Sequence, residues 1–214
     1  MGFQKKFIVV EGPIGVGKTT LAAKLARTFN CKTMLENFVD NPFLKKFYQD
    51  PKKYALATQL YFLLKRSQQY VDYKLKRTVE SCIVSDYFLE KDKLFAKTIL
   101  DADELDLYTK IYNNLGLKSL KPDLIIYLQA SPDTLLTRIK SRSISYEQGI
   151  TNNYINDIVD AYTNYFHEYK ESPLLIINTS NVNINKSHDY TMLTNEIRKN
   201  IKGKKYFNPT ALDD

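Results

Sequence analysis

Ten residues near the N-terminus, EGPIGVGKTT (11–20), combine glycines with a lysine and two threonines. Gly12, Gly17, Lys18 and Thr19 satisfy the pattern G-x-x-x-x-G-K-[S/T]. In this pattern backbone N–H groups and a helix dipole hold phosphates, the lysine reaches the outer phosphates, and the hydroxyl binds Mg²⁺. The sequence therefore predicts a site for ATP with its Mg²⁺ ion. The predicted phosphate loop comprises Gly12, Pro13, Ile14, Gly15, Val16, Gly17, Lys18, Thr19 and Thr20.

The residues on either side of the loop support this interpretation. FIVV (7–10) is typical of a buried strand, and TTLAAKLARTF (19–29) repeats its apolar residues at helical spacing. The loop therefore joins a strand to the N-terminus of a helix, which is the context that a phosphate loop requires. A glycine-rich turn with an exposed lysine is the alternative, and this context disfavours it.

Four further apolar runs, at 31–36, 81–86, 123–129 and 174–178, alternate with helical patterns. Short aliphatic runs separated by helices predict a parallel sheet that is covered on both faces. We therefore expect a doubly wound α/β fold with a five-stranded parallel sheet. Ligands of such folds gather at the carboxyl ends of the strands. The polar residues that end the four runs are Glu36, Asp86, Gln129 and Asn178.

Glu36 and Asp86 are the two acidic residues in this set. Glu36 could accept a proton from a hydroxyl that lies beside the γ-phosphate, and such general-base help is worth roughly 10²–10⁴ in rate. Asp86 is a candidate for Mg²⁺ binding beside Thr19. An isolated carboxylate at the end of a strand can also be an ordinary surface residue. Position alone therefore does not decide whether Glu36 and Asp86 are functional or only solvent-exposed.

The segment between the second and third runs (41–79) is long and rich in Tyr and Phe. From Tyr54 onward its leucines recur three and four residues apart, which predicts a long helix. This helical insert is large enough to cover a pocket or to form a subunit interface. Further helices are expected at 154–170 and around 191–201, whereas the tail at 202–214 has no assigned structure.

Arg138 and Arg142 lie four residues apart near the end of the helix that follows QASPDT. They therefore share a helix face and could close over a transferring phosphoryl group, whose equatorial oxygens need positive charge. The alternative is that they only complement the dipole at the C-terminus of the helix.

Composition adds limits. The 214 residues fit one domain (1–214), and the net charge of +7 comes from lysines and arginines spread along the whole chain, so we expect no nucleic-acid partner. No apolar run is long enough to span a membrane, so no membrane partner is expected. The two cysteines, Cys31 and Cys82, adjoin apolar runs, which predicts buried thiols in a reducing, cytoplasmic compartment.

The motifs in this order resemble the deoxynucleoside kinase family, from the first strand to at least Asn178. EGPIGVGKTT resembles the phosphate loop of that family, LENFVDNPFLKKFYQD its base-bearing strand end with the following helix, and TQLYFLLKR its substrate-binding helix. RIKSR with YEQGI (138–150) resembles its lid. The resemblance implies a P-loop kinase fold with a helical insert and a lid. It also implies ATP-dependent 5′-phosphorylation of a deoxynucleoside in nucleotide salvage, by a homodimer or, alternatively, a tetramer.

The resemblance also implies roles for single residues. Glu36 would receive the proton of the 5′-hydroxyl, while Tyr48 and Glu147 would contact the 3′-hydroxyl of the sugar. Gln59 would read the edge of the base with Arg66 in support, seven residues further along the same helix. Arg138 and Arg142 would act from the lid, with Lys18 on the phosphates.

The chain departs from the family pattern in two places. Tyr87 stands where many relatives have an arginine after the third strand, and Lys91 or Lys93 could supply the missing charge. Ile144 replaces a third lid arginine. Either Glu90 or Asp92 could contact the base. The segment SDYFLEKDKLFAK (85–97) resembles the same segment in a bacterial branch of the family that is associated with purine deoxynucleosides. This resemblance favours deoxyadenosine as the substrate, with deoxyguanosine or deoxycytidine as alternatives.

Two other functions fit parts of the sequence. A nucleoside monophosphate kinase of the thymidylate kinase type shares the fold but needs cations to hold the phosphate of the acceptor, which the missing arginine disfavours. A regulatory or nucleic-acid-binding module that uses ATP as a switch has only the basic charge in its favour.

Overall fold

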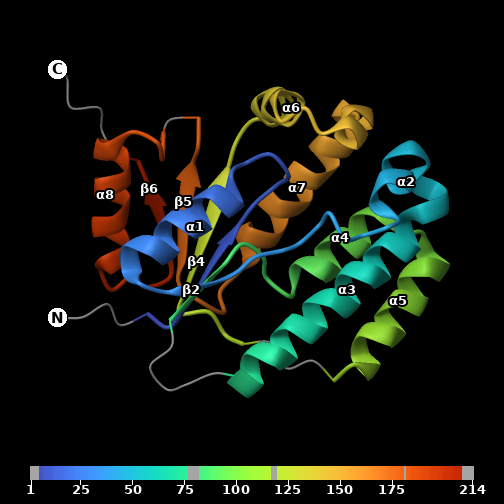
Figure 1. Cartoon of the computed structure of the whole chain (residues 1–214), viewed down its shortest axis with the longest axis horizontal. Helices are drawn as coiled ribbons and strands as arrows, with labels where there is room; N and C mark the ends of the chain where they lie inside the picture. The colour runs from blue at the N-terminus through green and yellow to red at the C-terminus, as the bar shows by residue number, and fades with distance from the viewer. Residues whose placement is uncertain (1–4, 77–81, 117–119, 181, 209–214) are drawn as a thin grey trace.

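The computed structural model describes residues 5–76, 82–116, 120–180 and 182–208. It contains one parallel sheet in the order β2-β3-β1-β4-β5-β6 (Figure 1). The strands are β1 (Phe7–Glu11), β2 (Lys32–Met34), β3 (Ile83–Ser85), β4 (Leu124–Gln129), β5 (Leu174–Asn178) and β6 (Lys204–Phe207). The predicted α/β fold with a parallel sheet is confirmed.

The sheet has one strand more than the five that the sequence predicts. β6 lies in the tail at 202–214, to which no structure was assigned, and it pairs with β5 at the edge of the sheet. Lys204, Lys205 and Tyr206 are exposed and only Phe207 is buried. A basic edge strand of this kind carries little of the apolar signal by which a buried strand is recognised.

The helices are α1 (Lys18–Phe29), α2 (Leu44–Gln49), α3 (Pro51–Lys76), α4 (Lys91–Ile99), α5 (Ala102–Asn114), α6 (Pro132–Ser141), α7 (Asn152–Glu168) and α8 (Ser187–Arg198), with a 3₁₀ turn η1 (Ser145–Gly149). The predicted helices at 154–170 and 191–201 correspond to α7 and α8. Among the described residues, none of these helices has both the length and the apolar character needed to cross a membrane.

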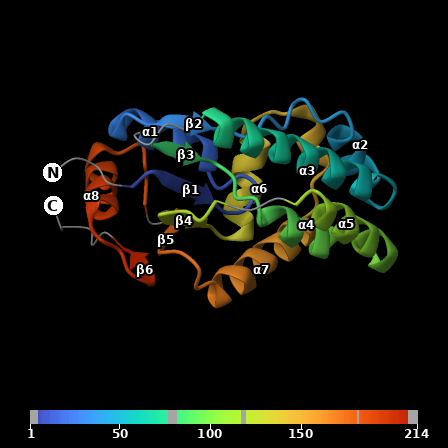
Figure 2. The same cartoon turned by 90° about the horizontal axis from the view of Figure 1, so that it is seen from below.

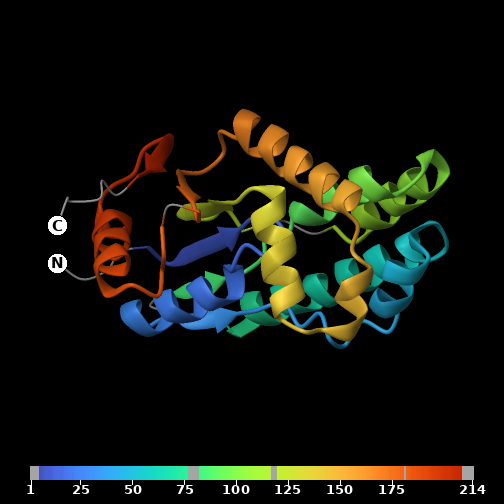
Figure 3. The same ribbon diagram turned by 90° about the horizontal axis from the view of Figure 1, so that it is seen from above.

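Alternate residues of each strand build the core on opposite faces of the sheet. Ile8 and Val10 of β1 pack with α1, α6 and α8, whereas Phe7 and Val9 face α3, α4 and α7. Figures 2 and 3 show α1 and α7 on opposite sides of the strands. This period of two is the pattern expected of a sheet covered on both faces.

The helical insert packs with α4 and α5 into a third apolar cluster, beyond the carboxyl ends of the strands. Leu44 and Phe47 of α2 pack with Leu63 of α3 and with Tyr108 and Tyr112 of α5. Figure 1 shows α2 to α5 gathered at the end of the sheet where β1 leads into α1. The insert therefore covers the edge at which the predicted site residues lie.

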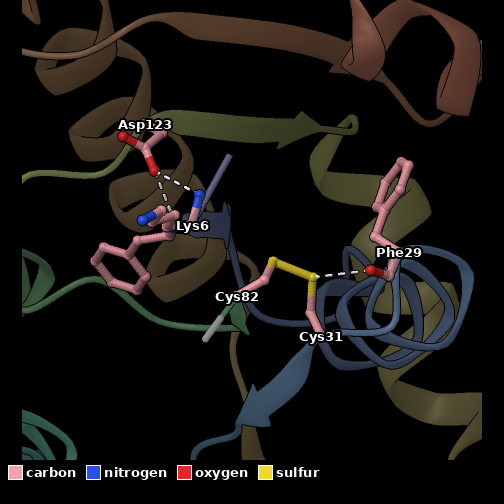
Figure 4. The surroundings of a disulfide bond; sticks show 6 residues. Lys6, Phe29, Cys31, Cys82 and Asp123 are labelled. Atoms are coloured by element: carbon pink, nitrogen blue, oxygen red, sulfur yellow. Dashed lines mark hydrogen bonds between the residues drawn. A yellow bond between two sulfur atoms is a disulfide. The ribbon is translucent and has the colours of Figure 1, made fainter. Parts of the chain in front are cut away.

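The two cysteines form a disulfide, so the expectation of free thiols was wrong. Lys32 pairs with Ile83, which places Cys31 and Cys82 directly opposite each other before β2 and β3 (Figure 4). Their Cα atoms are 4.7 Å apart, within the range that a disulfide bridges. Composition and spacing cannot reveal this pairing because they do not give the register between two strands.

We predict that this bridge contributes to stability. The bond closes a loop across 51 residues of sequence separation, for which chain entropy gives about 4 kcal/mol. Replacing both cysteines in a Cys31→Ser/Cys82→Ser variant should lower the melting temperature by about 8–16 °C in a domain of this size.

Differential scanning calorimetry with and without a reductant checks this prediction. The reductant should lower the melting temperature of the wild type and leave that of the double variant unchanged. Alkylation of both cysteines in the denatured, unreduced wild-type protein would contradict the bridge.

Candidate functional site

The phosphate loop adopts a conformation that depends on glycine. Gly12 and Gly17 have φ angles of 149° and 101°, which residues other than glycine rarely adopt. A Cβ atom on Gly12 would also lie 2.4 Å from the carbonyl oxygen of Leu128 in β4. The loop is therefore pressed against the neighbouring strand, and α1 begins directly after Gly17.

Lys18 folds back over the loop. Its ammonium donates hydrogen bonds to the carbonyl oxygens of Gly12 (2.8 Å) and Pro13 (3.0 Å). Burial, together with the nearby ammonium of Lys91, lowers the pKa of Lys18 to about 8. A bound phosphate would favour the charged form again, so this lysine is placed to hold an anion.

Glu11, which the sequence analysis did not select, holds the phosphate loop in place through hydrogen bonds. Its buried carboxylate accepts hydrogen bonds from the backbone N–H groups of Gly12 (3.0 Å) and Phe88 (3.0 Å) and from the hydroxyl of Tyr162 (2.8 Å). It thus links β1, the residues after β3, and α7. The rule that selected Glu36 and Asp86, a polar residue at the end of a strand, would also have found it.

Thr19 and Asp86, the predicted Mg²⁺ residues, are in direct contact. The Thr19 hydroxyl donates to Asp86 Oδ2 (2.5 Å), and Asp86 Oδ1 accepts from the backbone N–H of Glu36 (2.8 Å). In the described part of the chain, no three His, Cys, Asp or Glu side chains form a metal site of their own. A hydroxyl and one carboxylate beside a phosphate loop fit Mg²⁺, which is commonly held by few protein oxygens together with phosphates.

Glu36 belongs to a buried cluster of charges. Arg66 donates from Nε (2.7 Å) and from Nη2 to Glu36 Oε1, and from Nη1 to Asp92. Lys91 lies 3.3 Å from the other oxygen, Glu36 Oε2. Burial would raise the pKa of Glu36, but Arg66 and Lys91 together hold it at about 2. Glu36 is therefore ionised at neutral pH, with cations on both of its oxygens.

The structure distinguishes the two lysines that the sequence left as alternatives for the missing charge. Lys91 is buried and contacts Glu36, whereas Lys93 is exposed and lies over the ring of Tyr112 (4.2 Å). Asp92 is fully buried against Arg66. Tyr87, in the place of the missing arginine, points its hydroxyl at Gln69 (2.8 Å) and carries no charge toward the site.

A cavity of about 350 Å³ joins these parts. It extends from the phosphate loop to the helical insert. All of the predicted substrate residues line it: Glu36, Tyr48, Gln59, Arg66, Asp86 and Glu147. The fold thus brings together residues from five separate segments of the chain, although their individual roles remain predictions.

Tyr48 and Glu147 lie at the lid side of this cavity. The ring of Tyr48 stacks on that of Tyr146 in η1, with ring centroids 6.2 Å apart. Glu147 is 4 % exposed, and its Oε2 atom has no hydrogen-bond partner among the described residues. Burial raises the pKa of Glu147, while Arg142, 4.0 Å away, opposes that rise. A buried carboxyl group with a free oxygen is suited to bind a hydroxyl of a ligand.

The two lid arginines do not converge in this structure. Arg142 lines the 350 Å³ cavity, but Arg138 donates to the hydroxyl (2.8 Å) and the carbonyl oxygen (3.0 Å) of Thr179 after β5. Arg138 lines a second cavity, of about 530 Å³, together with Gly15 and Asp189. Four-residue spacing predicts one face of α6 for both arginines, but their side chains line different cavities.

A family model described as "Deoxynucleoside kinase" matches residues 8–202. The chain belongs to the deoxynucleoside kinase family. The match covers β1 to β5, apart from the first residue of β1, and all of the site residues described above, so the resemblance seen in the sequence is confirmed.

Relatives with established names agree with this assignment. The chain is 38% identical over 159 residues to a deoxyguanosine kinase from Bacillus subtilis (strain 168), covering 73% of this chain and 76% of the relative. It is 32% identical over 208 residues to a deoxyadenosine kinase from Dictyostelium discoideum, covering 94% and 81%.

A solved structure is also similar. The deoxyadenosine kinase from M. mycoides, with the products dCMP and a flexible dCDP bound, superimposes with a TM-score of 0.79 at 26% identity, covering 89% of this chain and 98% of that one. The protein is accordingly a kinase that phosphorylates deoxynucleosides with ATP.

We predict that Arg66 is essential to the structure of this deoxynucleoside kinase site. An Arg66→Met variant keeps the length of the side chain but leaves Glu36 and Asp92 without their shared partner. Removing one partner of a buried ion pair costs about 3–5 kcal/mol.

Urea denaturation should show a loss of stability of that size. Lys65→Met is the matched control, because Lys65 is exposed on the same helix and should change stability by less than about 0.5 kcal/mol. Equal stability of the two variants would show that the cluster does not stabilise the fold.

Proposed function

We propose that this protein transfers the γ-phosphoryl group of ATP to the 5′-hydroxyl of deoxyadenosine, with Mg²⁺ as cofactor. The single observation that supports it most is the continuous cavity from the phosphate loop to Gln59, with Glu36 between the two ends. A nucleoside that lies along this cavity presents its sugar hydroxyl between the carboxylate and the γ-phosphate.

In this proposal Glu36 orients the acceptor. A carboxylate with a pKa of about 2 is a weak base, but a loose transition state for phosphoryl transfer needs little removal of the proton before the new bond forms. The 5′-oxygen bonds to the γ-phosphorus, the bond to the bridging β,γ-oxygen breaks and its electron pair leaves with ADP. The hydroxyl proton passes to Glu36 late in the transfer.

Positive charge around the transferred group comes from this chain and from the metal. Lys18 reaches the outer phosphates and Arg142 faces the same cavity from the lid. Mg²⁺, held by Thr19 and Asp86, would supply charge neutralisation on the phosphates. The second cavity, beside Gly15 and Arg138, has a suitable position for the base and sugar of ATP.

The preference for adenine rests on which donors are free. A glutamine amide matches the N6 and N7 atoms of adenine, whereas the O6 and N7 acceptors of guanine suit an arginine fork. Gln59 lines the cavity, and its amide makes no hydrogen bond to any of the residues that the structure describes. The Arg66 fork, in contrast, is taken by Glu36 and Asp92.

The charges also favour a nucleoside over a nucleoside monophosphate as acceptor. Among the described residues, the cations that contact Glu36 are Arg66 and Lys91, and both are bound to carboxylates. A second phosphate group would need a cation that is free to bind it.

Initial rates with Mg²⁺ and ATP test the reaction. The substrates are deoxyadenosine, deoxyguanosine, deoxycytidine, thymidine and their 5′-monophosphates, each with the wild type and with Glu36→Gln. We expect deoxyadenosine to have the highest kcat/KM and Glu36→Gln to lower kcat about 10²–10⁴-fold. Glu168→Gln, on the exposed surface of α7, is the control and should retain full activity. Phosphorylation of a monophosphate but of no nucleoside would contradict the proposal.

A second prediction concerns the base. Gln59→Leu should lower kcat/KM for deoxyadenosine about 5- to 150-fold, since a bidentate contact is worth about 1–3 kcal/mol of discrimination. Gln68→Leu, at an exposed position of the same helix, is the control. In the Gln59→Leu variant, the ratio of kcat/KM for deoxyadenosine to that for deoxyguanosine, measured by competition, should also become smaller. An unchanged ratio of kcat/KM between deoxyadenosine and deoxyguanosine would show that Gln59 does not read the base.

A further inference from the structure

Lys91 is a buried cation whose place in the reaction the family motifs do not supply. It lies at the start of α4, is 7 % exposed, and lines the same cavity as Glu36 and the phosphate loop. Its ammonium is 3.3 Å from Glu36 Oε2 and 5.4 Å from the ring centroid of Phe95. A lysine is rarely buried to this extent unless it is paired with an opposite charge, here that of Glu36.

The two oxygens of Glu36 are held in different ways. Oε1 accepts two hydrogen bonds from the planar fork of Arg66, which anchors this one oxygen to α3. Among the described residues, the ammonium of Lys91 is the only side-chain donor to Oε2. Without Lys91 the carboxylate could turn about its Oε1 contact, because a single fork on one oxygen does not define where the other oxygen points.

The charges of the cluster balance only when Lys91 is included. Arg66 is shared between Glu36 and Asp92, so these three side chains carry one net negative charge. With Lys91 the cluster is formally neutral. A net negative charge beside the path of the γ-phosphate would repel it, and a pocket that excludes water would screen that repulsion poorly.

The nearest alternatives do not perform this role. Tyr87 is fully buried and its hydroxyl is engaged by Gln69, so it adds no positive charge. Lys93 is exposed and lies over Tyr112 on another face of α4.

We propose that Lys91 is a positioning residue, which fixes Glu36 Oε2 for the acceptor hydroxyl and keeps the cluster neutral as the γ-phosphoryl arrives. This role rests on the proposed phosphorylation of a deoxynucleoside. It places the cation of the acceptor side on the first turn of α4 instead of at the end of β3, so the charge that Tyr87 lacks is supplied from a neighbouring element.

Steady-state kinetics with deoxyadenosine and Mg²⁺·ATP test the role through four variants. Lys91→Met removes the charge and keeps the length of the side chain, Lys91→Gln keeps a donor without the charge, and Lys91→Arg restores a cation. Lys93→Met is the control from the same helix. Thermal melting of each variant confirms that it is folded at the assay temperature.

We expect Lys91→Met and Lys91→Gln to lower kcat about 10- to 100-fold, which is part of the roughly 10²–10⁴-fold contribution of the carboxylate they position. KM for deoxyadenosine should change less than about 3-fold, because the contacts to the base and the sugar remain. Lys91→Arg should recover part of the rate, and Lys93→Met should match the wild type.

A double variant separates positioning from a general effect on the fold. If Lys91 acts through Glu36, then Glu36→Gln/Lys91→Met should be no slower than Glu36→Gln alone, within about 3-fold. Additive losses, or a kcat of Lys91→Met within 2-fold of an active wild type, would overturn the role of Lys91 and leave the proposed function standing. A wild type inactive toward every deoxynucleoside would overturn both.

Discussion

The ion pairs of Arg66 are the interaction on which the rest of the site depends. This guanidinium comes from α3, in the helical insert, and binds Glu36 after β2 and Asp92 on α4. Because a buried carboxylate without a partner is costly, the insert and the edge of the sheet must stay together for either charge to be accommodated. The cluster thus fixes the distance between the part of the fold that binds phosphates and the part that covers the acceptor.

The sheet and the insert divide the work between them. The parallel strands end at one edge, where Glu11 is the last residue of β1 and Glu36 and Asp86 come shortly after β2 and β3. Glu11 accepts hydrogen bonds from the backbone N–H groups of Gly12 and Phe88, and Asp86 accepts one from that of Glu36. These bonds fix the phosphate loop and the backbone at Glu36 before any ligand binds. The insert adds a cavity wall that a simple strand-helix-strand connection would not provide.

The sequence predicted the parts of the molecule that carry strong local signals. The loop from Gly12 to Thr20, the β1 to β5 core and the long helix from Tyr54 onward follow from apolar spacing and from one motif of known chemistry, although the helix begins at Pro51 in the structure. The register between β2 and β3 has no local signal, so the bond between Cys31 and Cys82 was missed. β6 was missed because its two exposed lysines interrupt the apolar pattern by which a strand is recognised.

Side-chain direction was the other limit of the sequence analysis. Spacing placed Arg138 and Arg142 on one face of α6, yet Arg138 bonds Thr179 and only Arg142 reaches the acceptor cavity. Spacing likewise could not choose Lys91 over Lys93.

The most direct test of the proposed binding mode is a crystal structure of the protein with deoxyadenosine and a non-hydrolysable ATP analogue. It should show the 5′-hydroxyl within hydrogen-bond distance of Glu36 and the adenine edge on Gln59. A nucleoside bound with its sugar away from Glu36 would contradict the account.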